Sequence, residues 1–206
     1  MTVARDKVSD IYLDSFSVLA NVLFALCMFS SVLKIDFAGQ NLSDADLIPF
    51  ILSSFNSFAN FVVAFIFLAM YWIKFVGKQA HLVRSNNPLL IIWLFYLALL
   101  CLYPFAENLI GNYPDSSVAQ IAFSAIWAII GIVGLVSWWY ASYAKLIDPE
   151  LGVIAERRIL WESMPEPIAA LISIPFALFS DVGYYLALLL VVPANYYISV
   201  RFSEKA

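Results

Sequence analysis

The chain has 206 residues, of which 63% are hydrophobic and only 13% are charged, and its mean hydropathy is +0.87. A soluble domain is roughly half apolar and a quarter charged, so this composition excludes a protein whose main solvent is water. The net charge is −4, and the charged residues lie almost entirely in predicted loops and tails. No basic patch is interleaved with exposed aromatic residues, which excludes nucleic-acid binding.

Long apolar stretches predict an all-α, polytopic membrane protein with one domain over residues 1–206. A helix needs about 20 mainly apolar residues to cross roughly 30 Å of hydrocarbon. The predicted membrane helices cover residues 11–33, 48–73, 88–106, 118–143, 167–180 and 184–200. The stretch 167–180 is the shortest and is also compatible with a re-entrant or interfacial segment. Pro175 and Pro193 lie inside the last two stretches and should kink them.

The distribution of basic residues predicts the orientation of these six helices. Cytoplasmic loops carry an excess of Lys and Arg. If both termini are cytoplasmic, only Lys34 of the eleven basic residues falls on the outer side. The sequence therefore predicts a multi-pass protein of the cell (plasma) membrane with its N- and C-termini cytoplasmic. The loop 144–164 is the longest predicted inner connection.

The sequence lacks the residue arrangements that enzymes use for catalysis. The single histidine, His81, lies in a predicted inner loop without Cys or carboxylate neighbours at metal-ligand spacing. No Gly-rich phosphate loop or nucleophile elbow is present. Intramembrane carboxylate pairs of the kind that proton-coupled carriers use are also missing. We expect no enzyme activity, no cofactor and no metal site.

Uncharged polar residues are concentrated in the first two predicted helices. The first carries Ser17 and Asn21, and the second carries Ser53, Asn56, Ser57 and Asn60 at spacings i, i+3, i+4 and i+7. This spacing puts the second set on one stripe of the helix. Such a stripe either forms hydrogen bonds with neighbouring helices or lines a wet cavity. The sequence leaves both alternatives open, with Asn21, Ser17, Asn56 and Asn60 as a candidate polar network.

Several segments give the chain a family resemblance. Tyr71-Trp72 closes the second helix, Leu102-Tyr103-Pro104-Phe105 leads into Gly111-Asn112-Tyr113-Pro114, and the last hairpin reads IPFALFSDVGYYLALLLVVP. In these features the chain resembles the bacterial members of the transmembrane protein 175 family. The resemblance covers about residues 10 to 200. It implies six-helix subunits that assemble into homotetrameric, potassium-permeable channels in membrane lipid, with K⁺ as the expected ion.

The first helix departs from the family pattern of an Arg followed four residues later by Phe-Ser-Asp. Aligned on the helix end Val32-Leu33-Lys34-Ile35, the Phe-Ser-Asp positions are Leu19-Ala20-Asn21 and the Arg position is Ser15. The resemblance implies that first helices surround the pore axis, with the narrowest ring one turn beyond the Asp position, at Leu26. Helical spacing adds Phe29, Leu33 and the neighbouring Ser30.

These positions support two hypotheses about function. In the first, Leu26, Phe29, Ser30 and Leu33 line a hydrophobic pore constriction of a monovalent cation channel, because such a ring can gate by dewetting. In the second, they are ordinary core or lipid-facing residues of a non-conducting scaffold or partner-binding protein that keeps the channel fold. The loss of both Arg and Asp motivates the second hypothesis. A small-molecule carrier would need discontinuous helices, and only Pro175 and Pro193 point to them.

Overall fold

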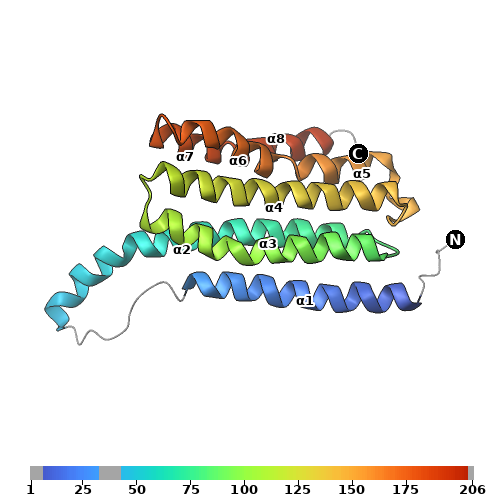
Figure 1. Ribbon diagram of the computed structural model, residues 1–206, viewed down its shortest axis with the longest axis horizontal. Coiled ribbons are helices and arrows are strands. Elements are labelled where there is room, and N and C mark those ends of the chain that lie inside the picture. Colours follow the sequence, from blue (N-terminus) through green and yellow to red (C-terminus); the bar gives the residue numbers. More distant parts are fainter. Residues whose placement is uncertain (1–6, 33–42, 204–206) are drawn as a thin grey trace.

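The computed structural model describes residues 7–32 and 43–203, and these form helices (Figure 1). In chain order they are α1 (Lys7–Val32), α2 (Asp44–Ala80), α3 (Asn87–Asn112), α4 (Ser117–Tyr143), the short 3-10 helix η1 (Pro149–Leu151), α5 (Gly152–Glu162), α6 (Pro165–Phe176), α7 (Asp181–Leu189) and α8 (Val191–Ser203). Across these ranges the only extended pairing is an isolated antiparallel bridge between Leu82 and Ile147. The predicted all-α fold is confirmed.

Polar side chains fix where three of these helices begin. Asn86 accepts a hydrogen bond from the backbone N–H of Leu89 at 3.0 Å. Ser116 does the same for Ala119 at 3.5 Å, and Ser180 for Gly183 at 3.1 Å. Each cap satisfies one backbone donor that has no partner inside the helix. The turns before α3, α4 and α7 are therefore set by local sequence.

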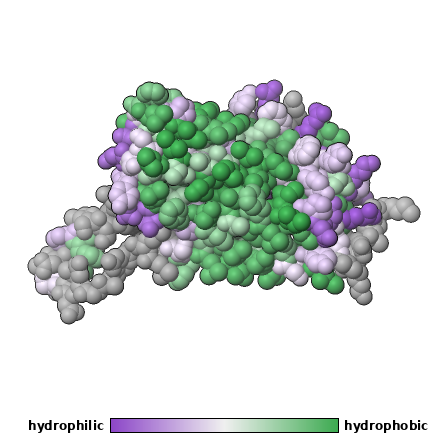
Figure 2. All heavy atoms as spheres, in the orientation of Figure 1, coloured by the Kyte–Doolittle hydropathy of each residue, from purple (hydrophilic) through white to green (hydrophobic). Residues whose placement is uncertain are grey.

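The helices lie side by side in layers, with α1 at one edge, α2 and α3 next to it, α4 beyond them, and α6 to α8 on the far side (Figure 1). Figure 2 shows an apolar band over the middle of the molecule, with hydrophilic residues gathered at its two ends. Among the described residues, four helical stretches are long and apolar enough to cross a membrane, namely Ser9–Ser30, Asn87–Asn112, Ser117–Tyr143 and Asp181–Ile198. The fold is that of a membrane protein.

One end of the bundle collects several connections. The beginning of α1, the α2–α3 turn, α5 and the end of α8 all lie toward it (Figure 1). We call this the basic end. It carries the α2–α3 turn and the loop 144–164, which are predicted inner connections and therefore hold basic residues. The position of both termini on one side of the membrane stays a prediction. Which side is cytoplasmic stays a prediction.

The second half of the chain differs from the predicted elements. The connection 144–164 contains the helix α5, and the predicted stretch 167–180 is the 12-residue helix α6, only about 18 Å long. Pro175 lies in the last turn of α6 rather than in mid-helix. The predicted stretch 184–200 is two helices that meet at Leu190. Pro193 has no N–H to donate to the carbonyl of Leu189, which accounts for this break.

An aromatic cluster holds α1 against α2 and α3. The ring of Phe75 on α2 lies 5.9 Å from Phe24 of α1 and stacks on Tyr96 of α3 at 5.5 Å between centroids. Phe16 of α1 lies 5.0 Å from Trp93 of α3. All five rings are buried, and such pairs stabilise packing beyond the apolar area that they bury. Helix α1 is thus anchored along one face.

Candidate functional site

Helix α1 has a buried face and an exposed face. Leu13, Phe16, Ala20, Phe24 and Cys27 are buried against the bundle. An exposed stripe, which we call the α1 outer stripe, runs along the opposite side at helical spacing and consists of Ser15, Leu19, Val22, Leu26 and Phe29. It begins with the hydroxyl of Ser15 near the basic end and is apolar from Leu19 to Phe29.

Two of the four predicted pore residues lie on this stripe. Leu26 and Phe29 are each 57% exposed. Ser30 lies beside them, partly buried, and its hydroxyl donates a hydrogen bond to the carbonyl of Cys27 on its own helix at 2.7 Å. Leu33 lies outside the described residues. The structure therefore brings Leu26 and Phe29 together on one surface, as helical spacing predicts.

The predicted polar network is only partly described. The indole N–H of Trp72 on α2 donates a hydrogen bond to the side-chain oxygen of Asn21 on α1 at 2.8 Å. Ser17 is half-buried and lines a small hollow beside Gln79 of α2. Asn56 and Asn60 lie in α2, but their side chains are outside the described residues. The partner that the structure gives Asn21 is Trp72, which the sequence analysis names only as part of the pair that closes the second helix.

A charged cluster that sequence reasoning missed lies inside the bundle. The ammonium group of Lys74 on α2 forms an ion pair with the carboxylate of Glu166 on α6. The same ammonium group donates to the backbone carbonyl of Glu162 and, at 3.1 Å, to the side-chain oxygen of Asn195 on α8. Glu166 is only 3% exposed. Since a buried charge is tolerated when it is paired and hydrogen-bonded, this cluster joins α2, α6 and α8.

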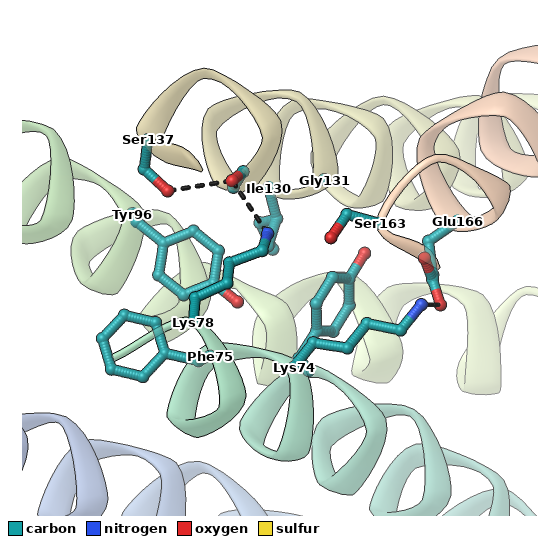
Figure 3. Close-up of a pocket in the computed structure, with 11 residues that line it drawn as sticks. Lys74, Phe75, Lys78, Tyr96, Ile130, Gly131, Ser137, Ser163 and Glu166 are labelled. Atoms are coloured by element: carbon teal, nitrogen blue, oxygen red, sulfur yellow. Dashed lines mark hydrogen bonds and ion pairs between the residues drawn. The ribbon is translucent and has the colours of Figure 1, made fainter. Parts of the chain in front are cut away.

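A second lysine lies one turn further along α2. Lys78 is 9% exposed, and its ammonium group donates to the carbonyl of Gly134 on α4 at 2.9 Å. Figure 3 shows Lys74 reaching toward Glu166 while Lys78 reaches toward α4. A cavity of about 20 Å³ lies between them, enough space for one water molecule. Tyr71 closes it, with its hydroxyl donating to the carbonyl of Trp127 at 3.3 Å.

The two lysines correct the predicted end of the second helix. The prediction ended this helix at residue 73 and placed Lys74 and Lys78 in a loop, whereas α2 continues to Ala80. Their charge argued for a loop, but acceptors on α4, α6 and α8 satisfy them inside the bundle. The one available signal for Glu166 was its position between Pro165 and Pro167 at the start of an apolar run. Asn195 gave no signal.

Comparisons with known proteins relate this chain to a channel family and to a solved fold. The sequence model of the family described as "Endosomal/lysosomal potassium channel TMEM175" matches residues 15–104. None of the curated proteins gives a significant match. Among solved structures, the fold is similar to the crystal structure of a lysosomal potassium-selective channel TMEM175 homolog from Chamaesiphon minutus, with a TM-score of 0.73 and 18% identity. The alignment covers 93% of this chain and 98% of that chain.

The matched region contains the elements that build the outer stripe and its anchor. Residues 15–104 include most of α1, all of α2 and most of α3. The shared fold extends over nearly the whole chain. The sequence match relates residues 15–104 to the TMEM175 family, and the solved structure shows that the fold is shared.

Proposed function

We propose that the chain is one subunit of a homotetrameric, potassium-permeable cation channel whose pore is lined by the α1 outer stripe. The family is described as a potassium channel, and the similar solved structure is that of a potassium-selective channel homolog. Leu26 and Phe29 form the constriction in this proposal. The membrane is the plasma membrane, with both termini cytoplasmic, as the basic residues predict.

The observation that carries the proposal is the polar side chain of Asn21, which precedes Val22 of the outer stripe in the chain and faces Trp72 of α2. Asn21 lies near the middle of α1, is exposed, and uses its oxygen for Trp72. Its amide N–H₂ group has no partner among the described residues. A free amide at membrane depth is costly in lipid. This edge of α1 is therefore better suited to a protein neighbour or to water than to hydrocarbon.

The chemistry of the stripe fits a hydrophobic gate. Ser15 supplies a polar side chain at the basic end, and Leu19, Val22, Leu26 and Phe29 follow it. A narrow apolar ring excludes water when closed and conducts once it is widened. Four Phe29 rings around one axis would occupy a closed pore. We therefore expect low basal conduction that rises when the stripe is trimmed.

The direct test is K⁺ flux into liposomes that contain the purified protein, repeated with Na⁺. We expect Leu26→Ala to raise K⁺ flux severalfold because it widens the constriction. The matched control is Leu94→Ala on α3, an exposed leucine on another helix with 50% exposure, which should leave flux unchanged. Equal fluxes for K⁺ and Na⁺ would retain the channel and remove the potassium preference.

A second pair of variants tests the aromatic position. Phe29→Ala should raise flux, whereas Phe95→Ala on α3, with 54% exposure in the native chain, should not. Absence of flux in the native protein and in both trimmed α1 variants removes the channel function. The non-conducting scaffold then becomes the better account of the fold.

The assembly is tested independently of conduction by cross-linking in membranes. In a background with Cys27→Ala and Cys101→Ala, we expect Leu26→Cys to cross-link subunits under mild oxidation, and Leu94→Cys not to. Particle images of the detergent-solubilised protein should show fourfold symmetry with α1 central. A monomer, or a dimer with α1 at its periphery, contradicts the proposal.

A further inference from the structure

A second cavity, of about 330 Å³, lies at the basic end between α2 and α5 and is called the basic hollow here. Its α2 wall carries Lys74, Lys78 and His81, and its α5 wall carries Arg158 and Glu162. Three lysine and arginine side chains thus share the lining with one carboxylate, and two of them are already engaged, Lys74 by Glu166 and Lys78 by the carbonyl of Gly134. Among the lining cations, Arg158 has donors left to receive an anion.

Arg158 has hydrogen-bond donors that are available to a ligand in this hollow. Its Nε donates to the carboxylate of Glu162 one turn later at 2.7 Å, and its two terminal N–H₂ groups have no partner among the described residues. Guanidinium groups of this kind bind phosphate oxygens in a two-pronged geometry. His81 is half-buried on the opposite wall. Both side chains can therefore contribute to binding a phosphate group in the hollow.

Backbone hydrogen bonds hold the two walls in place. The N–H of Asp148 donates to the carbonyl of His81 at 2.9 Å, and the N–H of Val83 donates to the carbonyl of Leu146 at 3.0 Å. They tie the α2–α3 turn to the segment that leads into α5. The hollow is therefore formed before any ligand enters it, which lowers the entropic cost of binding.

The surroundings of the hollow match a lipid better than a free ion. Ile73 lines it and is strongly exposed, and Trp161 and Ile154 are exposed on α5. Apolar and aromatic side chains next to basic ones are typical of a helix at the membrane–water interface. Gly77 lines the same hollow, and a Cβ added there would meet no atom within 4 Å. Space for a headgroup thus lies next to apolar surface for an acyl chain.

We infer that the basic hollow binds the phosphate headgroup of an anionic phospholipid, held by Arg158 and His81, with the acyl chain against Ile73. Basic pockets between membrane helices are a known way of holding such headgroups. The inference does not rest on ion conduction, because lipid binding is measured on the protein whether or not it conducts.

The test measures lipid binding by native mass spectrometry of the detergent-solubilised full chain, with phosphatidylglycerol and phosphatidylcholine as probes. We expect the native protein to retain phosphatidylglycerol in preference. Arg158→Gln should weaken this binding about tenfold, the factor that corresponds to the loss of one charge-assisted hydrogen bond. The matched control is Arg157→Gln, the neighbouring exposed arginine that does not line the hollow, and it should bind as the native protein does.

Gly77 provides a variant that blocks the site without disturbing the fold. Gly77→Leu should fill the hollow and abolish the preference for phosphatidylglycerol, whereas Gly77→Ala should retain most of it. Both substitutions favour the helix relative to glycine, so thermal unfolding should show no loss of stability. Retained preference in Gly77→Leu contradicts the site.

Competition with inorganic phosphate distinguishes a site for a lipid headgroup from a site for a soluble phosphate ion. If it displaces phosphatidylglycerol at equal concentration and stabilises the native protein equally, the hollow is a site for a soluble anion and the lipid proposal fails. If it does neither, the acyl chain is required, as proposed. Equal loss of binding in Arg157→Gln and Arg158→Gln, or no preference for phosphatidylglycerol, also overturns the proposal.

Discussion

The side-chain oxygen of Asn21 on α1 accepts a hydrogen bond from the indole N–H of Trp72 on α2 at 2.8 Å. Both residues are exposed at the α1–α2 edge of the chain. The bond gives the edge helix a polar contact with α2 in addition to its aromatic anchor. Asn21 stands at the position for which the family resemblance implies an aspartate.

This contact should have a measurable coupling energy. We predict a coupling of about 0.5–1 kcal/mol between Asn21→Ala and Trp72→Phe in a double-mutant cycle, because a neutral hydrogen bond contributes about that much. The measurement is chemical unfolding in detergent, with the two singles and the double variant. Additive effects would mean that the contact contributes nothing to stability.

The buried ion pair between Lys74 and Glu166 should matter far more than a surface pair. Removing either partner leaves a buried charge unpaired, so Lys74→Met and Glu166→Gln should each destabilise the fold by about 3 kcal/mol. The control pair is Arg158 and Glu162, whose side chains are both more exposed. Arg158→Gln should cost less than about 1 kcal/mol.

The combined variant Lys74→Met with Glu166→Gln tests the reason for that cost. It removes both charges, so it should be less destabilised than the sum of the two single variants. Unfolding midpoints in detergent measure this. Strict additivity would indicate that the two residues act separately rather than as a pair.

Close packing between α4 and α6 depends on one glycine. A Cβ at Gly131 would lie 2.8 Å from Cδ of Pro167, a distance that real side chains do not tolerate. We predict that Gly131→Ala destabilises the protein by about 1–3 kcal/mol, the cost of overpacking. Gly77→Ala is the matched control, since open space surrounds that position. It should stabilise the protein by about 0.5–1 kcal/mol.

A buried hydroxyl chain links α4, α6 and α7. Ser124 donates to the hydroxyl of Tyr184 at 3.1 Å and lies 2.8 Å from the hydroxyl of Ser173, and Tyr184 donates to the carbonyl of Gln120 at 3.1 Å. Tyr184→Phe should cost about 1–2 kcal/mol, because it leaves buried polar groups unsatisfied. Tyr185→Phe removes one exposed bond to the carbonyl of Pro114. It should change the unfolding midpoint little, and equal effects would contradict this account.

The first, third and fourth helices could be predicted from sequence because hydrocarbon thickness fixes the length of an apolar run. The predicted stretch 88–106 lies within α3 (Asn87–Asn112). The predicted stretch 118–143 begins one residue after the start of α4 (Ser117–Tyr143) and ends at the same residue. The end of α2 could not be predicted, because the acceptors for Lys74 and Lys78 come from helices more than fifty residues away. Local hydropathy contains no information about such partners.

The candidate site divides in the same way. Helical periodicity alone puts Leu26 and Phe29 on one face, and the structure exposes both. Periodicity contains no information about Trp72 as the partner of Asn21, or about Arg158 and His81 as residues that line one hollow. The helix α5 was missed because its charged residues, such as Glu156 and Arg157, made the segment resemble a loop. These features depend on tertiary contacts.

The aromatic cluster beneath α1 restricts how such a subunit could open. Twisting α1 about its own axis would move Leu26 and Phe29 away from their position, but it would also pull the rings of Phe16 and Phe24 away from Phe75 and Trp93. That loss of buried aromatic area is large compared with the energies that usually separate two channel states. A tilt of α1, α2 and α3 as one rigid unit keeps these ring contacts of α1, so opening should displace all three helices together.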